Sequence, residues 1–460
     1  MVNSGFLDEL NMILATDFYQ LTMGAAYYQE NLEKLNGIED DMALFDLFIR
    51  KLPKNRNYLI FAGLEQVIHY LQNAKFTERT IKFLKARDEF RNIDSDFFDS
   101  YLPKFRFNLD VWSLKEGTFF FANEPVMRIQ GPMLHAQLAE TFILNVINYQ
   151  TIVASKASRI KNVATDKILL EFGTRRSHSP LAGVYAARAS FIAGFNGTSN
   201  VIADLELGIK SSGTMAHSFV QRFDNEEEAF DFYYKIYGKN SILLIDTYDT
   251  EKAAKIACKY GNKILGVRID SGNLIENSKK VRKILDENGC KEVIIVASSD
   301  LNEYKVKYLL ENGAPIDAFG IGTELVTSRD DPALAAVYKL VEYQGKPRIK
   351  TSEDKLTYPG KKQLYRLYDN NGKFLKDIIT LEKEPTPTNS EILLTQVMEK
   401  GKLRIDLPNL KDIQQYYLEN IKNLPSTFKN IDNEIDFKVE ISEELHELTE
   451  ALQNKTYSTY

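Results

Sequence analysis

Residues 166–328 repeat one pattern: a short apolar run ends in a polar cluster that often contains glycine, and most clusters lead into an amphipathic segment. Apolar runs without polar alternation are typical of parallel strands that are buried on both faces. When such strands alternate with helices, their carboxyl ends share one rim, where α/β barrels carry their active sites. The pattern therefore predicts an irregular parallel α/β barrel with candidate site residues on its rim. The apolar runs are Ile168–Phe172, Val201–Ala203, Ile242–Ile245, Ile264–Ile269, Val293–Ala297 and Ala318–Ile321.

The length of 460 residues is too great for one ordinary core, so more than one domain is expected. Residues 1–135 mix helix and strand patterns, and we expect an N-terminal α+β domain there, joined by residues 336–380. Residues 136–335 should form the barrel domain. Residues 336–460 should form a C-terminal hairpin and a helical tail. The predicted fold class is thus α/β, with a second α+β domain.

Composition limits the classes of partner. A net charge of -6 gives no general attraction to nucleic acid or to an anionic membrane, so a phosphate-bearing ligand needs a local site. The first residues lack the basic and apolar regions of a signal peptide, and no apolar run approaches a membrane span. We therefore expect a cytoplasmic protein without nucleic-acid or membrane partners. Cys258 and Cys290 have no CxxC spacing and are interpreted as small buried side chains.

Two polar clusters carry titratable or charged side chains. His217 lies in Gly213–Ser218, where it is a candidate general base, phosphoryl acceptor or hydrogen-bonded loop residue. No metal site is predicted, because no HExxH motif or histidine cluster accompanies it. Arg268 should lie at a buried strand end and needs an anionic partner, either a ligand carboxylate or Asp270. Asp270 and Ser271 suit a ribose diol and a phosphate, although this turn can also cap the next helix.

Two further clusters suit a flat ring and phosphate groups. Phe172 can stack on a heterocycle or belong to the core, and Arg175 can bind phosphate oxygens or form a surface salt bridge. Gly322 and Thr323 follow the last apolar run, where barrel loops commonly hold a phosphate through backbone N–H groups. A tight turn is the alternative for that loop. Lys156 and Arg159, one helical turn apart, are expected to be solvated.

These clusters, in this order, resemble those of the nicotinate phosphoribosyltransferases, which are type II phosphoribosyltransferases of NAD synthesis. The resemblance covers most of residues 10–330. It implies that nicotinate and phosphoribosyl pyrophosphate (PRPP) give nicotinate mononucleotide and pyrophosphate, coupled to ATP hydrolysis. The matching segments are Ala15–Met23, Glu171–Arg176, Gly213–Phe219, Gly266–Gly272 and Phe319–Thr323.

The resemblance also implies roles for individual residues. His217 would be phosphorylated transiently by ATP. Tyr19 and Phe172 would sandwich the pyridine ring, with Tyr19 supplied by the partner subunit of a homodimer that shares its active sites. Thr214 and Arg268 would bind nicotinate. The phosphoribosyl part would be held by Arg175, Asp270, Ser271, Gly322 and Thr323.

The chemistry of the implied reaction fits these side chains. Displacement at the ribose anomeric carbon develops oxocarbenium character, which the Asp270 carboxylate can stabilise as a catalytic residue. Mg²⁺ would neutralise the leaving pyrophosphate, held mainly by ligand oxygens and water. This manner of binding leaves no metal motif in the sequence.

Two other functions are considered. A related nicotinamide phosphoribosyltransferase would have an acidic residue after the Gly197-Thr198 pair, whereas this chain has Ser199. A carboxylate there would repel nicotinate, so Ser199 favours the acid as substrate. A non-catalytic nucleotide-binding protein that kept the fold is the second alternative. The presence of Tyr19, His217 and the Arg268–Asp270 pair argues against it.

Overall fold

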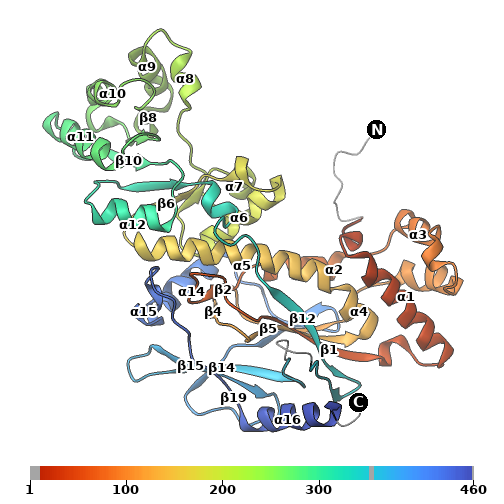
Figure 1. Ribbon diagram of the computed structural model, residues 1–460. Coiled ribbons are helices and arrows are strands. Elements are labelled where there is room, and N and C mark those ends of the chain that lie inside the picture. The colour runs from red at the N-terminus through yellow and green to blue at the C-terminus, as the bar shows by residue number, and fades with distance from the viewer. Residues whose placement is uncertain (1–10, 352–356, 458–460) are drawn as a thin grey trace. The chain divides into compact units, whose positions relative to one another are not determined.

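The structure is a computed structural model that describes residues 11–351 and 357–457. The chain forms two compact units, and each is described by itself. The first unit comprises Met1–Thr151, Ala333–Phe428 and Glu434–Tyr460. The second comprises Ile152–Pro332 and Lys429–Asn433, and its elements run from yellow to cyan in Figure 1. Helix α5 (Glu140–Val163) begins in the first unit and ends in the second.

The second unit alternates strands and helices, as predicted. Its six strands form one parallel sheet in the order β7-β6-β11-β10-β9-β8. The strands are β6 (Ile168–Glu171), β7 (Gly197–Thr198), β8 (Ile242–Leu244), β9 (Gly266–Ile269), β10 (Ile294–Ala297) and β11 (Ala318–Ile321). The helices are α6 (Pro180–Ile192), α7 (Val201–Leu207), α8 (His217–Gln221), α9 (Glu226–Tyr237), α10 (Thr250–Ala257), α11 (Leu274–Glu287), α12 (Glu303–Glu311) and α13 (Thr323–Val326).

The predicted α/β class is confirmed, whereas closure of the sheet into a barrel is not. In the part of the chain that the structure describes, β7 and β8 end the strand order and do not pair with each other. Five of the six predicted apolar runs contain a strand of this sheet. Nearly all of these strand residues are buried, as expected for strands that are covered on both faces.

The prediction of a strand at Val201–Ala203 is wrong, because these residues begin helix α7. The Asn200 side chain accepts a hydrogen bond from the backbone N–H of Ala203, which is N-terminal capping. Gly208, with a φ of 67°, ends the helix in the left-handed conformation that glycine adopts without strain. The strand at this place is the short β7, which precedes the helix.

The first unit is α+β and contains most of the antiparallel pairing. Its largest sheet has the order β13-β12-β1-β5-β3-β17-β18, and a second sheet has the order β16-β14-β15-β19. The sequence of Met42–Ile49 indicates a strand, which is β1, and that of Asp369–Gly372 indicates a tight turn, which joins β14 to β15. The sequence at 348–352 also suggests a strand, but residues 348–351 are not in one, and residue 352 lies outside the described residues. The strands of this unit are β1 (Met42–Ile49), β2 (Leu59–Ile60), β3 (Asp110–Ser113), β4 (Phe119–Phe120), β5 (Pro125–Pro132), β12 (Ala336–Tyr343), β13 (Lys346–Pro347), β14 (Lys362–Tyr368), β15 (Phe374–Leu381), β16 (Ser390–Ile392), β17 (Thr395–Glu399), β18 (Lys402–Leu403) and β19 (Val439–Ile441).

Along the chain, the helices of the first unit come before, between and after the strands of these sheets. They are α1 (Phe18–Glu33), α2 (Leu64–Asn73), α3 (Glu78–Lys85), α4 (Met133–Leu138), α14 (Leu410–Asn423), α15 (Ser426–Lys429, whose last residue falls in the second unit) and α16 (Glu443–Tyr457). Among the described residues, none of the helices combines the length and the apolar character that crossing a membrane requires.

Candidate active site

A cavity of about 560 Å³ lies at the carboxyl ends of the parallel strands in the second unit. The residues around it follow β6, β7, β9, β10 and β11, so the shared rim predicted from the sequence exists. Most of its side chains are small, polar or cationic, which suits a ligand that carries phosphate groups. The lining residues are Phe172, Thr174, Arg175, Arg176, Ser199, Ser212, Gly213, Thr214, Arg268, Asp270, Ser298, Ser299, Asp300, Gly320, Gly322 and Thr323.

Arg268 lines this cavity, and little of its side chain is exposed. Its Nη1 donates a hydrogen bond to Thr214 Oγ1, and its Nη2 lies 3.3 Å from Asp270 Oδ2. Its side chain is 16% exposed, and its buried Nε has no hydrogen-bond partner among the residues that the structure describes. The guanidinium therefore keeps donor capacity for an anionic ligand, although Asp270 already balances part of its charge.

Asp246 is a residue that sequence reasoning missed. It follows β8, and its Oδ2 accepts hydrogen bonds from the backbone N–H of Asp270 at 2.9 Å and from Ser271 Oγ at 2.5 Å. These two hydrogen bonds hold the start of the loop after β9 in place. Its Oδ1 is buried and has no hydrogen-bond partner within residues 11–351 and 357–457. The signal that could have found it is its position, because it is the first residue after a predicted strand, as Asp270 is.

His217 lies at the start of α8, beside the lining residues. Its Nδ1 is 3.2 Å from Thr247 Oγ1, and its Nε2 is 3.8 Å from Asp270 Oδ2. The side chain is 39% exposed, so a small reagent can reach the ring. The neighbouring hydroxyl and carboxylate orient the imidazole as a nucleophile or proton acceptor would require.

The Phe172 ring lies against the backbone of Gly320. A Cβ added to Gly320 would lie 2.3 Å from Cδ2 of the Phe172 ring, so only glycine leaves room for the ring where it stands. Glu171 holds the turn that follows β6, since its carboxylate accepts hydrogen bonds from Gly173 N–H and Thr198 Oγ1. Burial raises the pKa of the Glu171 carboxyl, and these two hydrogen bonds oppose the rise.

The loop after β10 has an unusual backbone. Ser299 and Asp300, which both line the cavity, have φ values of 125° and 44°. Left-handed φ values are uncommon for residues other than glycine and collect at functional sites. Ser298 Oγ donates a hydrogen bond to Asp270 Oδ1, which ties this loop to the one after β9.

The structure brings together most of the predicted site residues but not all of them. Ser271 and His217 are not lining residues: Ser271 follows the lining residue Asp270 in the chain, and His217 Nε2 lies 3.8 Å from Asp270 Oδ2. Tyr19 belongs to α1 of the first unit and is 48% exposed. The seven predicted residues that line the cavity are Phe172, Arg175, Thr214, Arg268, Asp270, Gly322 and Thr323.

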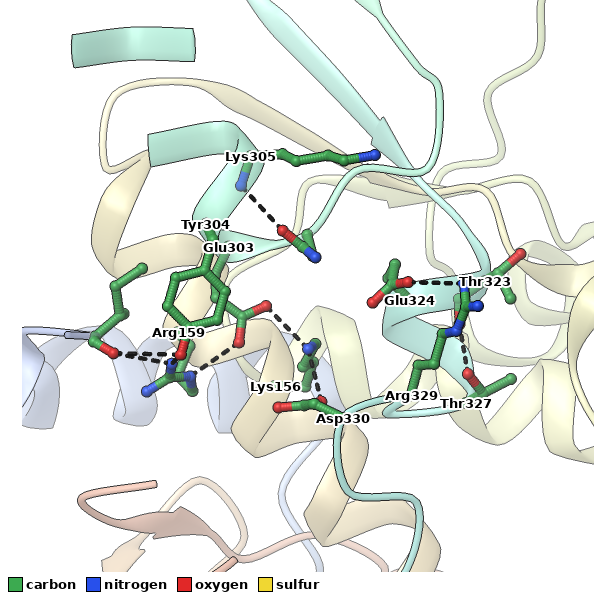
Figure 2. Close-up of polar contacts among 12 residues, drawn as sticks. Lys156, Arg159, Glu303, Tyr304, Lys305, Thr323, Glu324, Thr327, Arg329 and Asp330 are labelled. Atoms are coloured by element: carbon green, nitrogen blue, oxygen red, sulfur yellow. Dashed lines mark hydrogen bonds and ion pairs between the residues drawn. The ribbon is translucent and has the colours of Figure 1, made fainter. Parts of the chain in front are cut away.

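The expectation that Lys156 and Arg159 are solvated is wrong. Lys156 is 1% exposed and lies 2.9 Å from Glu303 Oε2 and 2.7 Å from Asp330 Oδ1. Arg159 Nε donates a 3.0 Å hydrogen bond to the other oxygen of Glu303. Figure 2 shows Lys156 between the two carboxylates. We call these four residues the buried ionic cluster.

Similarity to known proteins covers almost the whole chain. Residues 14–148 match the model of the nicotinate phosphoribosyltransferase N-terminal domain, and residues 168–372 match that of the nicotinate phosphoribosyltransferase family. Residues 361–394 and 386–449 match the model of the corresponding C-terminal domain. Along the chain, the N-terminal model matches first, the family model next and the C-terminal model last.

Individual relatives agree with the family models. A nicotinate phosphoribosyltransferase of Bacillus subtilis (strain 168) is 40% identical over 479 residues, which cover 96% of this chain and 95% of that protein. One from Mycobacterium tuberculosis is 40% identical over 427 residues, with 91% and 89% covered. The crystal structure of human nicotinic acid phosphoribosyltransferase matches with a TM-score of 0.84 at 26% identity, covering 95% and 99% of the two chains. The chain therefore belongs to the nicotinate phosphoribosyltransferase family.

Proposed function

We propose that this protein is a nicotinate phosphoribosyltransferase that forms nicotinate mononucleotide and pyrophosphate from nicotinate and PRPP. The observation that carries the proposal is the cavity itself. It joins a half-buried aromatic ring, a guanidinium with an unpartnered donor and two glycine-containing loops at one rim. Membership of the family supports the same conclusion.

The nicotinate end of the reaction is assigned to Phe172, Thr214 and Arg268. Phe172 offers a ring face for the pyridine, and Arg268 offers N–H groups for the carboxylate. The ring nitrogen then attacks C1 of the ribose, and the bond from C1 to the pyrophosphate oxygen breaks, with the electron pair leaving on pyrophosphate. Asp270 stabilises the positive charge that develops on the ribose.

The phosphoribosyl end is assigned to the loops after β6, β9 and β11. Arg175 is exposed at the cavity and can pair with phosphate oxygens, while Gly322 and Thr323 present backbone N–H groups. Ser271 completes the loop after β9, where Asp246 holds its hydroxyl. These groups bind and orient PRPP, which lowers the entropic part of the barrier.

A magnesium ion bound with PRPP fits the oxygen donors at this rim. In the described part of the chain, no group of three or more His, Cys, Asp or Glu residues could hold a metal ion by itself. The Asp270 and Asp300 carboxylates and the unpartnered Oδ1 of Asp246 nevertheless supply hard oxygen atoms there. Mg²⁺ usually takes one or two protein carboxylates and completes its shell with water and substrate phosphates. When bound, it would neutralise charge on the leaving pyrophosphate.

We assign Tyr19 to the active site of a second subunit. Its exposed ring on α1 is available to another copy of the chain, and we assign it to the second face of the pyridine in a homodimer with shared active sites. In this arrangement Phe172 and Tyr19 would enclose the ring.

The experiment that tests the proposed function is a product assay. Nicotinate, nicotinamide and quinolinate are offered separately with PRPP and Mg²⁺, with and without ATP, and pyrophosphate and mononucleotide are measured. Nicotinate should give both products and should be preferred. Preference for nicotinamide would change the substrate, and absence of pyrophosphate release with all three would leave a nucleotide-binding protein.

His217 is expected to accept the γ-phosphoryl group of ATP, which couples ATP hydrolysis to the transfer. The phosphorus–nitrogen bond forms as the bond to ADP breaks, and water later cleaves the phosphohistidine. The added charge tightens PRPP binding through nearby cations or Mg²⁺. ATP labelled at the γ-phosphate should therefore mark the wild type and not His217→Ala.

The His217→Ala variant should keep some ATP-independent transfer, because the ring and phosphoribosyl contacts do not involve the imidazole. Thr247→Ala is a matched control, since it removes the hydroxyl next to Nδ1 while leaving the ring in place. Equal labelling of wild type and His217→Ala would place the phosphoryl acceptor on another residue.

Ser199 lines the cavity and bears on the choice between nicotinate and nicotinamide. Its Oγ is 3.3 Å from Thr174 Oγ1. Ser199→Asp should lower the ratio of kcat/KM for nicotinate to that for nicotinamide, because a carboxylate repels the acid and accepts a hydrogen bond from the amide. Ser199→Asn, similar in size and uncharged, is the control. A parallel fall for both substrates would show that this position does not read the carboxylate.

A further inference from the structure

The buried ionic cluster is larger and more costly than a stable core requires. A buried lysine loses its hydration, and its ion pairs repay that loss only with good geometry; well-packed apolar side chains often stabilise a fold as well. Lys156 has such geometry, with two carboxylates within 3 Å and almost no exposure. The segments that the cluster connects indicate what it contributes beyond stability.

Each carboxylate that contacts Lys156 follows a loop of the cavity. Glu303 is the first residue of α12 and comes three residues after Asp300, the last residue of the Ser298–Asp300 loop. Asp330 comes after Gly322, Thr323 and the short helix α13. Figure 2 shows Glu303 and Asp330 reaching Lys156 from these two segments. One ammonium group that is not part of the cavity lining thus contacts a carboxylate from each of the two segments.

Both segments hold backbone conformations that need external support. Ser299 and Asp300 have left-handed φ values just before Glu303, and Ser328 has a φ of 40° just before Asp330. Such conformations persist when the surrounding structure fixes them. The Ser298–Asp300 loop is fixed at its start by the hydrogen bond to Asp270, and at its end by Glu303 with Lys156 and Arg159.

We propose that Lys156 is a positioning residue that couples the loop after β10 to the loop after β11, so that both face the phosphoribosyl ligand together. Lys156 does not line the cavity and touches no reacting atom. It acts through Glu303 on Ser299 and Asp300, and through Asp330 on the segment that begins at Thr323. The substrate effect of this coupling rests on the proposed function, whereas the coupling itself does not.

Lys156→Met tests the coupling because methionine keeps the length of the side chain and removes its charge. Amide hydrogen exchange should become faster in residues 298–303 and 322–331, while β6 and β9 exchange as in the wild type. The KM for PRPP should rise by about tenfold or more, since small displacements of binding loops have large effects. The KM for nicotinate should change much less. Lys156→Arg should restore most of the PRPP binding, because arginine can pair with both carboxylates.

The matched control is Lys307→Met on the same helix as Glu303. Lys307 pairs with Asp432 and Glu311 near the surface, and its loss should change neither the exchange of the two loops nor the KM for PRPP. If Lys156→Met does not fold, Asp330→Asn replaces it, since this carboxylate is partly exposed; residues 322–331 should then exchange faster while 298–303 stay protected.

The outcomes separate the coupling from the proposed function. Unchanged exchange in both loops of Lys156→Met, or faster exchange in only one of them, would overturn the coupling. An equal rise in the KM for nicotinate and for PRPP would reduce Lys156 to a general structural residue. A wild type that does not use PRPP would refute the proposed function, and the exchange measurements would still decide the coupling.

Discussion

Arg268→Ala is expected to lower kcat/KM for nicotinate by about tenfold to a hundredfold or more. A charge-assisted hydrogen bond contributes about 1.5–3 kcal/mol, and about 1.4 kcal/mol corresponds to a factor of ten. The structure adds a second reason, because Asp270 Oδ2 lies 3.3 Å from Arg268 Nη2. Removing the guanidinium leaves that carboxylate without its cation, where it repels the carboxylate of nicotinate.

The comparison that isolates this effect uses two variants and two substrates. Arg268→Lys keeps the charge and loses the planar donor geometry, so it should lie between the wild type and Arg268→Ala. Thr214→Val removes the hydroxyl that accepts from Nη1 while leaving the cation in place. Use of nicotinamide should fall less than use of nicotinate in Arg268→Ala. Parallel losses for both substrates would show that Arg268 does not bind the carboxylate.

Arg366→Met is expected to lower the free energy of unfolding of the first unit by about 3–5 kcal/mol, since it leaves a buried carboxylate without its cation. Arg366 is 2% exposed, and its Nε and Nη2 donate to the two oxygens of Asp377 at 2.9 and 2.5 Å. The pKa of the nearby Glu124 carboxyl lies well above its ordinary value, mainly because this group is buried and also because the Asp377 carboxylate is close to it. The chain has one tryptophan, Trp112 in β3, so its fluorescence during urea unfolding reports on this unit.

The stability loss in Arg366→Met should depend on pH. A carboxyl whose pKa is raised in the folded state contributes stability below its unfolded pKa and loses it as the pH rises through the folded value. The Arg366 guanidinium lowers the pKa of the Glu124 carboxyl, so ionisation of this carboxyl becomes less favourable without it, and the loss of unfolding free energy should be larger at pH 8 than at pH 5. Lys376→Met on the same hairpin is the control, because its pair with Glu440 is partly exposed and contributes about 0–1 kcal/mol. Equal losses in the two variants would contradict the expectation.

The sequence was sufficient for elements whose pattern depends on local chemistry. Strand β1 and helix α9 could be placed from the sequence, because Met42–Ile49 has the length and largely apolar composition of a buried strand and Glu226–Tyr237 has an apolar stripe at helical spacing. Val201–Ala203 failed because three apolar residues do not distinguish a strand from a helix turn. The capping of α7 by Asn200 shows which signal outweighed them.

The candidate site likewise contains residues that could be placed from the sequence and residues that could not. Residues directly after apolar runs, such as Phe172 and Asp270, could be placed on the rim because strand direction determines where they lie. Lys156 could not, because its burial depends on Glu303 and Asp330, which are far away in the sequence. The support that Asp246 gives to Asp270 also depends on two strands being neighbours in the sheet, and adjacency of β8 and β9 is a property of the fold.

The discontinuous first unit has a consequence for synthesis on the ribosome. Strand β1 pairs with β12, and β3 pairs with β17, so both pairings join strands that emerge at very different times. Nearly all of the second unit is one continuous segment that emerges between those partners. One edge of β1 therefore has no native partner until residues 336–343 leave the ribosome, and an unpaired strand edge is a template for aggregation. The nascent chain thus requires a period of protection that ends only when its C-terminal part is translated.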